Sequence, residues 1–80
     1  MKLPAIKKLV ENASFEQLAL AEEAILNEQN PEIEVEGSDE GEMLTHIMAA
    51  QFIKNEMAEK NVDYMTAMRS YTSKVRTSIS

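Results

Sequence analysis

The chain has 80 residues, no cysteine, and 8 basic against 14 acidic residues, which gives a formal charge of −6. This length allows one domain at most, residues 1–80, and a domain of this size buries only about 60% of the surface of its unfolded chain. The lack of cysteine excludes disulfides and thiolate metal sites, and the negative charge argues against nucleic acid as a partner, because affinity for nucleic acid comes largely from lysine and arginine.

Two short helices are predicted at the start of the chain. Apolar residues recur at helical spacing over residues 3–12, and Pro4 suits the first turn of such a helix, where its missing N–H costs nothing. Ser14 and Gln17 have the spacing of a capping box, which predicts a second helix that begins after Ser14. This helix should end near Asn27, because a proline follows shortly and the residue before a proline disfavours helical geometry.

The stretch 31–41 differs in kind from the helices on either side. Residues 33–36, Ile-Glu-Val-Glu, alternate apolar and charged side chains with the period of a half-buried strand, and Gly37 can close the segment. A strand this short needs a partner strand, and no second strand is evident in the sequence. The segment is therefore either an extended connector or a strand that pairs with its own copy in a second subunit.

The longest predicted helix spans residues 39–60, with Asp39 as its N-cap and Glu42 at the third position beyond it. Its apolar residues cover an arc of roughly 220°, much wider than the stripe of an ordinary surface helix, so this helix should be central. A chain of 80 residues offers little protein to surround such a helix, and the pattern therefore favours a dimer. The arc is formed by Met43, Leu44, Ile47, Met48, Ala50, Phe52 and Met57.

A last helix is predicted from Tyr64 to about Ser78, capped by Asp63 and carrying one apolar stripe. Together the elements predict an all-α fold, or nearly so: a small four-helix domain with a central third helix and one short extended segment near residues 32–36. No apolar run approaches the roughly 18–20 residues that cross a bilayer. The first residues are too weakly apolar and too soon charged for a secretory signal, so no membrane partner and a cytoplasmic location are expected.

The sequence holds little that enzyme chemistry requires. It has no glycine-rich phosphate loop, and His46 is its one histidine. Glu42 lies four residues earlier, so the two side chains can meet on one helix face as metal ligands or as an oriented base. The simpler interpretation is a surface or interfacial pair, because a stable metal site needs three or four ligands. No catalytic, cofactor-binding or metal-ligating residue is predicted, and an enzyme that uses Glu42 and His46 remains the remote alternative.

Acidic residues dominate the middle of the chain, since no lysine or arginine occurs between Leu9 and Ile53. One interpretation is a docking strip over residues 32–42, with Glu34, Glu36 and Glu40 as the candidates that bind a basic protein surface. This would make the protein an acidic adaptor or inhibitor. The other interpretation is a solvated surface that the basic ends of the chain balance in part.

The leading functional hypothesis is a non-enzymatic protein–protein interaction module, without cofactor, that forms a homodimer through the apolar third and fourth helices. Pairing of Ile33 to Val35 across the two-fold axis is a further option for this dimer. The candidates for core and interface are Leu44, Ile47, Met48, Phe52, Met68 and Val75.

Motifs spread over nearly the whole chain resemble those of a family of short uncharacterised proteins from Bacteroides-type bacteria. They are the runs 31–37, 39–42, 44–46 and 49–50, together with residues 2–4, 6–10, 71–72, 75–76 and 78–80 near the two ends. The family is a domain of unknown function, so the resemblance transfers no activity and no site. It implies a small bacterial helical protein that is compatible with self-association.

Overall fold

Local capping fixes where the helices of this protein begin. Ser14 Oγ accepts a hydrogen bond from the Gln17 backbone N–H at 3.1 Å, and Gln17 Oε1 accepts one from the Ser14 N–H at 2.9 Å, which completes the predicted capping box. Asp39 and Asp63 each accept a hydrogen bond from the backbone N–H three residues on, at 2.8 and 2.9 Å. These bonds satisfy N–H groups that a helix start leaves without a partner.

The structure, a computed structural model, describes the backbone of residues 2–79 and the side chains of residues 2–75. It contains α1 (Leu3–Asn12), α2 (Phe15–Leu26), α3 (Glu40–Lys60) and α4 (Tyr64–Ile79), and no strand within residues 2–79. The predicted all-α fold with four helices is confirmed. No helix of the described part is long and apolar enough to cross a membrane.

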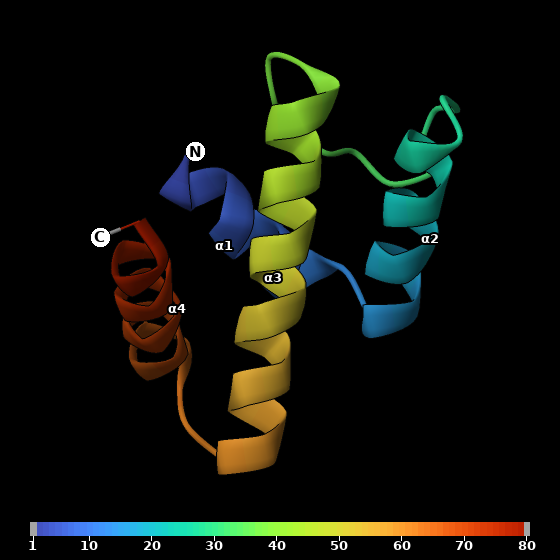
Figure 1. The fold of residues 1–80 in the computed structure, drawn as a ribbon. Coiled ribbons are helices and arrows are strands. Elements are labelled where there is room, and N and C mark those ends of the chain that lie inside the picture. The colour runs from blue at the N-terminus through green and yellow to red at the C-terminus, as the bar shows by residue number, and fades with distance from the viewer. Residues whose placement is uncertain (1, 80) are drawn as a thin grey trace.

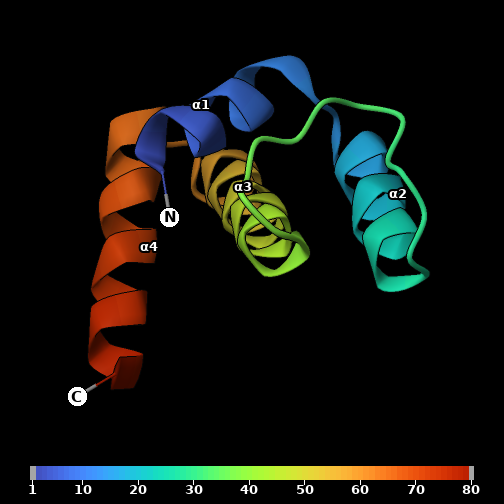
Figure 2. The same ribbon diagram turned by 90° about the horizontal axis from the view of Figure 1, so that it is seen from above.

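The third helix is central, as its wide apolar arc predicts. The helices α1, α2 and α4 each pack on α3, and in the view along α3 they lie above it and on its two sides (Figures 1 and 2). The core between them contains side chains that are fully shielded from solvent: Ile6, Leu18, Ile47, Ala49, Ala50, Ile53 and Ala67. One chain therefore covers three sides of its central helix.

The connector between α2 and α3 has no regular secondary structure, bends at residues 32–33, and follows the predicted alternation of burial. Val35 is buried and Ile33 packs against the core, whereas the side chains of Glu34 and Glu36 are exposed. The connector forms no strand within the chain, because its apolar side chains find their partners in the helical core. Gly37 is required where the connector meets α3, since an added Cβ would lie only 2.6 Å from Met43 Cγ and 2.9 Å from the Met43 backbone nitrogen.

Candidate functional site

The six apolar residues predicted for core or interface have different surroundings. Two are buried within the chain, three are half-buried and one is exposed: respectively Ile47 and Met68; Leu44, Phe52 and Val75; and Met48. Helices α3 and α4 thus turn part of this set inward and leave part of it at the surface. Leu44, Met48, Phe52 and Val75 retain exposed surface that another molecule could contact.

Three of the residues that retain exposure form one line along α3. Leu44, Met48 and Phe52 are spaced four residues apart, so they lie on one inclined row about 12 Å long, which we call the α3 ridge. Met48 stands in the middle of the row and is 55% exposed. Met48 faces solvent, whereas Leu44 and Phe52 are half-buried and also pack against the core.

The α3 ridge continues onto α4 through an aromatic contact. The rings of Phe52 and Tyr71 have centroids 5.5 Å apart and are tilted by 53°. The Lys74 ammonium lies 4.9 Å from the centroid of the Phe52 ring, at cation–π distance. These contacts fix the orientation of the Phe52 ring. Helices α3 and α4 therefore share one surface, with the α3 ridge along it and the Lys74 ammonium at its edge.

The acidic docking candidates lie on the connector and on the first turn of α3. Glu34, Glu36 and Glu40 are exposed, and none of them makes an ion pair with a described residue. The stretch 28–42 carries seven carboxylates and no lysine or arginine. The basic start of the chain balances this surface in part: the Ser38 N–H and, to a smaller extent, the charge of Lys2 hold the pKa of Glu42 below its usual value. Lys8, in contrast, lies across a shallow hollow from Glu34 without an ion pair to it.

The expectation of a surface pair at Glu42 and His46 is wrong, because the His46 side chain is 0% exposed. Its Nε2 accepts a hydrogen bond from the Lys2 backbone N–H at 2.9 Å, and its Nδ1 lies 2.7 Å from the Glu36 carbonyl oxygen. The two contacts assign the neutral ring with the proton on Nδ1, which donates to that carbonyl. His46 therefore ties the start of α1 and the end of the connector to α3.

The Glu42 carboxylate bonds to the backbone at the end of the connector, whereas both nitrogens of His46 are engaged with other groups. Its Oε1 accepts a hydrogen bond from the Ser38 backbone N–H at 2.8 Å. Among the described side chains, no group of three or more histidine, aspartate or glutamate residues is placed to hold a metal ion. The spacing of His46 from Ala50 and Ile53, at i+4 and i+7, was the sequence signal that could have placed the ring in the core.

Hydrogen bonding at two helix starts predicts how stability changes with pH. The Ser38 N–H holds the pKa of Glu42 below its usual value, and the Thr66 N–H does the same for the pKa of Asp63. A carboxyl with a lowered folded pKa contributes stability above its unfolded pKa, and loses it as pH falls through the folded value. We therefore expect unfolding free energy to decline as pH drops below about 4.

The variant Glu42→Gln tests this, because glutamine still accepts the N–H bond but has no charge. It should be less stable than the wild type at neutral pH, and the difference should shrink in acid, as followed by urea unfolding across a pH series. Glu59→Gln, at an exposed position on α3, is the control for charge alone. A difference that stays constant from neutral pH into acid would contradict the assignment.

Comparison with known proteins places the chain in a family. A model of a family of unknown function, DUF6952, matches residues 1–80, so the chain belongs to that family. This confirms the resemblance to a domain of unknown function. Searches of curated proteins and of solved structures returned no match.

Proposed function

We propose that this member of the family is a non-enzymatic protein–protein interaction module that forms a homodimer through the α3 ridge and the adjoining surface of α4. The observation that carries the proposal is the exposure of Met48, a large apolar side chain at the centre of the ridge on the solvent-facing side of α3. The proposal retains self-association through the third and fourth helices and narrows the contact on α3 from its whole apolar arc to this ridge.

The geometry of the ridge suits contact between two copies of α3. Rows of residues four apart interdigitate when two helices cross at about −50°, which is the commonest packing of helices. A standard interface takes about 800 Å² from each partner, roughly one seventh of the 5423 Å² surface of this chain. The ridge alone is too small for that area, so the α4 residues beside it, Tyr71 and Val75, belong to the proposed interface.

The state of His46 supports a non-enzymatic role. The ring is shielded from solvent and both of its nitrogens are engaged with backbone groups. A general base must reach the proton that it abstracts, and this ring does not face a surface from which a substrate could approach. Both ring nitrogens of His46 thus make hydrogen bonds that stabilise the fold.

Met48→Glu tests the interface, because it places a carboxylate at the centre of the proposed contact. We expect the variant to sediment as a monomer at concentrations where the wild type is dimeric, with its helical circular dichroism unchanged. Met65→Glu is the matched control, since Met65 is also exposed, at 56%, and lies about 120° around α4 from Tyr71. Equal masses of the Met48 and Met65 variants would contradict the proposed interface.

A second candidate function is docking of a basic protein on the acidic connector. It is favoured because the connector backbone is anchored to the core. Val35 is buried, and the Glu36 carbonyl oxygen accepts the hydrogen bond from His46. The carboxylates of Glu34 and Glu36 are therefore displayed from an anchored backbone, which reduces the entropy lost when a partner binds. Such binding should weaken steeply with salt, whereas apolar dimerisation should persist.

The test of this second candidate is the triple replacement of Glu34, Glu36 and Glu40 by glutamine, with a synthetic arginine-rich peptide as the probe. The triple variant should lose most of the affinity of the wild type in low salt, as measured by titration calorimetry. Its control replaces three exposed glutamates elsewhere by glutamine, namely Glu16, Glu23 and Glu59. If the two triple variants bind the peptide equally, the connector is no docking site.

A further inference from the structure

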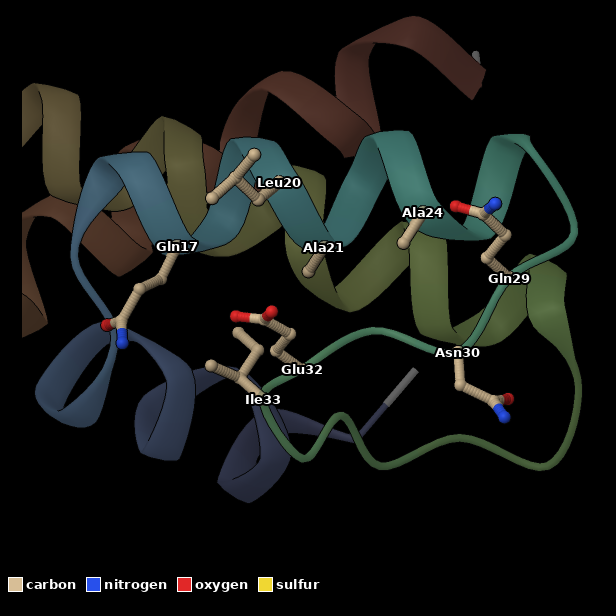
Figure 3. A pocket seen from close by; sticks show the side chains of 8 residues that line it. All are labelled: Gln17, Leu20, Ala21, Ala24, Gln29, Asn30, Glu32 and Ile33. Atoms are coloured by element: carbon tan, nitrogen blue, oxygen red, sulfur yellow. The ribbon is translucent and has the colours of Figure 1, made fainter.

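A hollow separates α2 from the start of the connector. Its volume is about 410 Å³, within the range of sites that bind small ligands or single side chains. Ala21 and Ala24 line it from α2, and Glu32 and Ile33 line it from the connector, as Figure 3 shows. The alanines leave this space open because they carry only methyl groups where the connector passes the helix.

The lining of the hollow has an apolar part and a polar part. Methyl groups of Ala21, Ala24 and Ile33 form the apolar part, and the side chains of Gln29 and Glu32 belong to the polar part. Glu32 is the one charged residue among those that line the hollow, and no described cation pairs with it. A ligand that fits has an apolar stem and a cationic head, which is the composition of an arginine or lysine side chain.

The backbone beside the hollow offers a second means of recognition. Residues 32–35 make no backbone–backbone hydrogen bond with any described residue, whereas the Glu36 carbonyl and the Ser38 N–H are already bonded to the side chains of His46 and Glu42. An extended chain can therefore lie along this stretch and pair with its N–H and C=O groups, in the manner of strand addition. The side chains that point outward, such as Glu34, alternate with the anchored ones and would flank the added chain.

The same arrangement argues against a second copy of the connector as the added chain. Antiparallel pairing centred on Glu34 would place Glu32 directly opposite Glu36 of the other copy, and like charges directly opposite one another destabilise a pair. A basic chain brings arginine or lysine to those positions and gains from each contact. Charge complementarity therefore selects a basic partner over self-pairing.

We propose that the hollow between α2 and the connector receives an arginine or lysine side chain from an extended basic segment of a partner protein, which pairs with the connector backbone. The proposal goes beyond self-association through the α3 ridge. It rests on the second candidate function, docking of a basic partner on the connector. It specifies where a side chain of that partner binds, the hollow lined by Glu32 and α2, which we call the seat. The seat uses Glu32 and α2, neither of which is among the docking candidates Glu34, Glu36 and Glu40.

The probe for this seat is a short synthetic peptide of alternating threonine and arginine with blocked ends. Two variants address the hollow by different means: Ala24→Leu fills it without changing charge, and Glu32→Gln removes its carboxylate. Their matched controls are Ala19→Leu, at an exposed position of α2, and Glu59→Gln on α3. Circular dichroism first establishes that all four variants retain the helical content of the wild type.

We expect Ala24→Leu and Glu32→Gln each to weaken peptide binding by about tenfold or more, and the controls to leave it within a factor of about two. The amide resonances that shift on titration should include residues 29–33 and the hollow side of α2. If the triple variant at Glu34, Glu36 and Glu40 loses binding while Ala24→Leu and Glu32→Gln keep it, the seat is wrong and docking on the connector stands. If the wild type does not bind the peptide at all, both proposals fail.

Discussion

Replacing Ile47 by alanine is expected to lower the free energy of unfolding by about 2–5 kcal/mol. Ile47 is 0% exposed and lies on the central helix, so truncation removes apolar contacts on the side where α3 meets the rest of the core. Typical domains are stable by only about 5–15 kcal/mol, and an 80-residue domain lies toward the low end of that range. The variant should therefore be largely unfolded at temperatures that the wild type withstands.

The neighbouring residue provides the control for this effect. Met48→Ala removes a side chain of similar size from the exposed ridge, and should change monomer stability by no more than about 0.5 kcal/mol. Urea unfolding at protein concentrations below the dimerisation range separates the two positions. Equal losses of stability in the Ile47 and Met48 variants would contradict the orientation of α3 on which the interface proposal depends.

Replacing His46 by leucine is expected to lower the free energy of unfolding by about 2–4 kcal/mol, although leucine occupies a comparable volume. The change leaves the Lys2 N–H and the Glu36 carbonyl without the partners that they have in the native protein, and an unsatisfied buried polar group costs about 1–3 kcal/mol. Part of this cost is relieved where water reaches the two backbone groups, since both residues lie at the edge of the core. The loss should thus stay below the sum for two fully buried groups.

Hydrogen exchange gives a readout that is specific to this role of His46. The Lys2 amide and the amides of the connector should exchange faster in His46→Leu, because the ring no longer holds the two segments against α3. Thr45→Ala, at the exposed position next to the histidine, is the control and should leave these rates unchanged. Unaltered exchange at Lys2 in the leucine variant would show that the ring does not anchor the chain start.

The helix bounds were predictable because the information that sets them is local. Ser14 with Gln17, and the caps Asp39 and Asp63, act on N–H groups within three residues, so the sequence around each helix start is sufficient. The inward and outward alternation of the connector was predictable for the same reason. Whether that alternation would form a strand depended on what Ile33 and Val35 meet in space, and they meet helices.

The burial of His46 was not predictable from such local patterns. One of its hydrogen bonds joins it to Lys2, 44 residues away in the sequence, and this contact exists only once α1 has packed on α3. The same holds for the coverage of α3. Its wide apolar arc indicated a central helix, but how many of its sides the chain itself covers depends on the placement of three other helices.

The hollow beside α2 has a fainter signal in the sequence. Ala21 and Ala24 are small residues three apart on one helix face, which is common in helices that approach another element closely. Here the neighbouring element is the connector, and the open space arises because its Glu32 and Ile33 do not fill the room that the alanines leave. Neither the alanines nor the connector would reveal this space alone.

The central claim, self-association through the α3 ridge, is tested most directly by the solution mass of the unmodified protein. Sedimentation equilibrium over a range of concentrations, at low and at high salt, measures this mass without a probe or a partner. The account predicts a mass that rises with concentration to twice the 9.0 kDa of one chain, and that holds or strengthens at high salt because the contact is apolar. A mass of 9.0 kDa at every concentration and at both salt levels would contradict it.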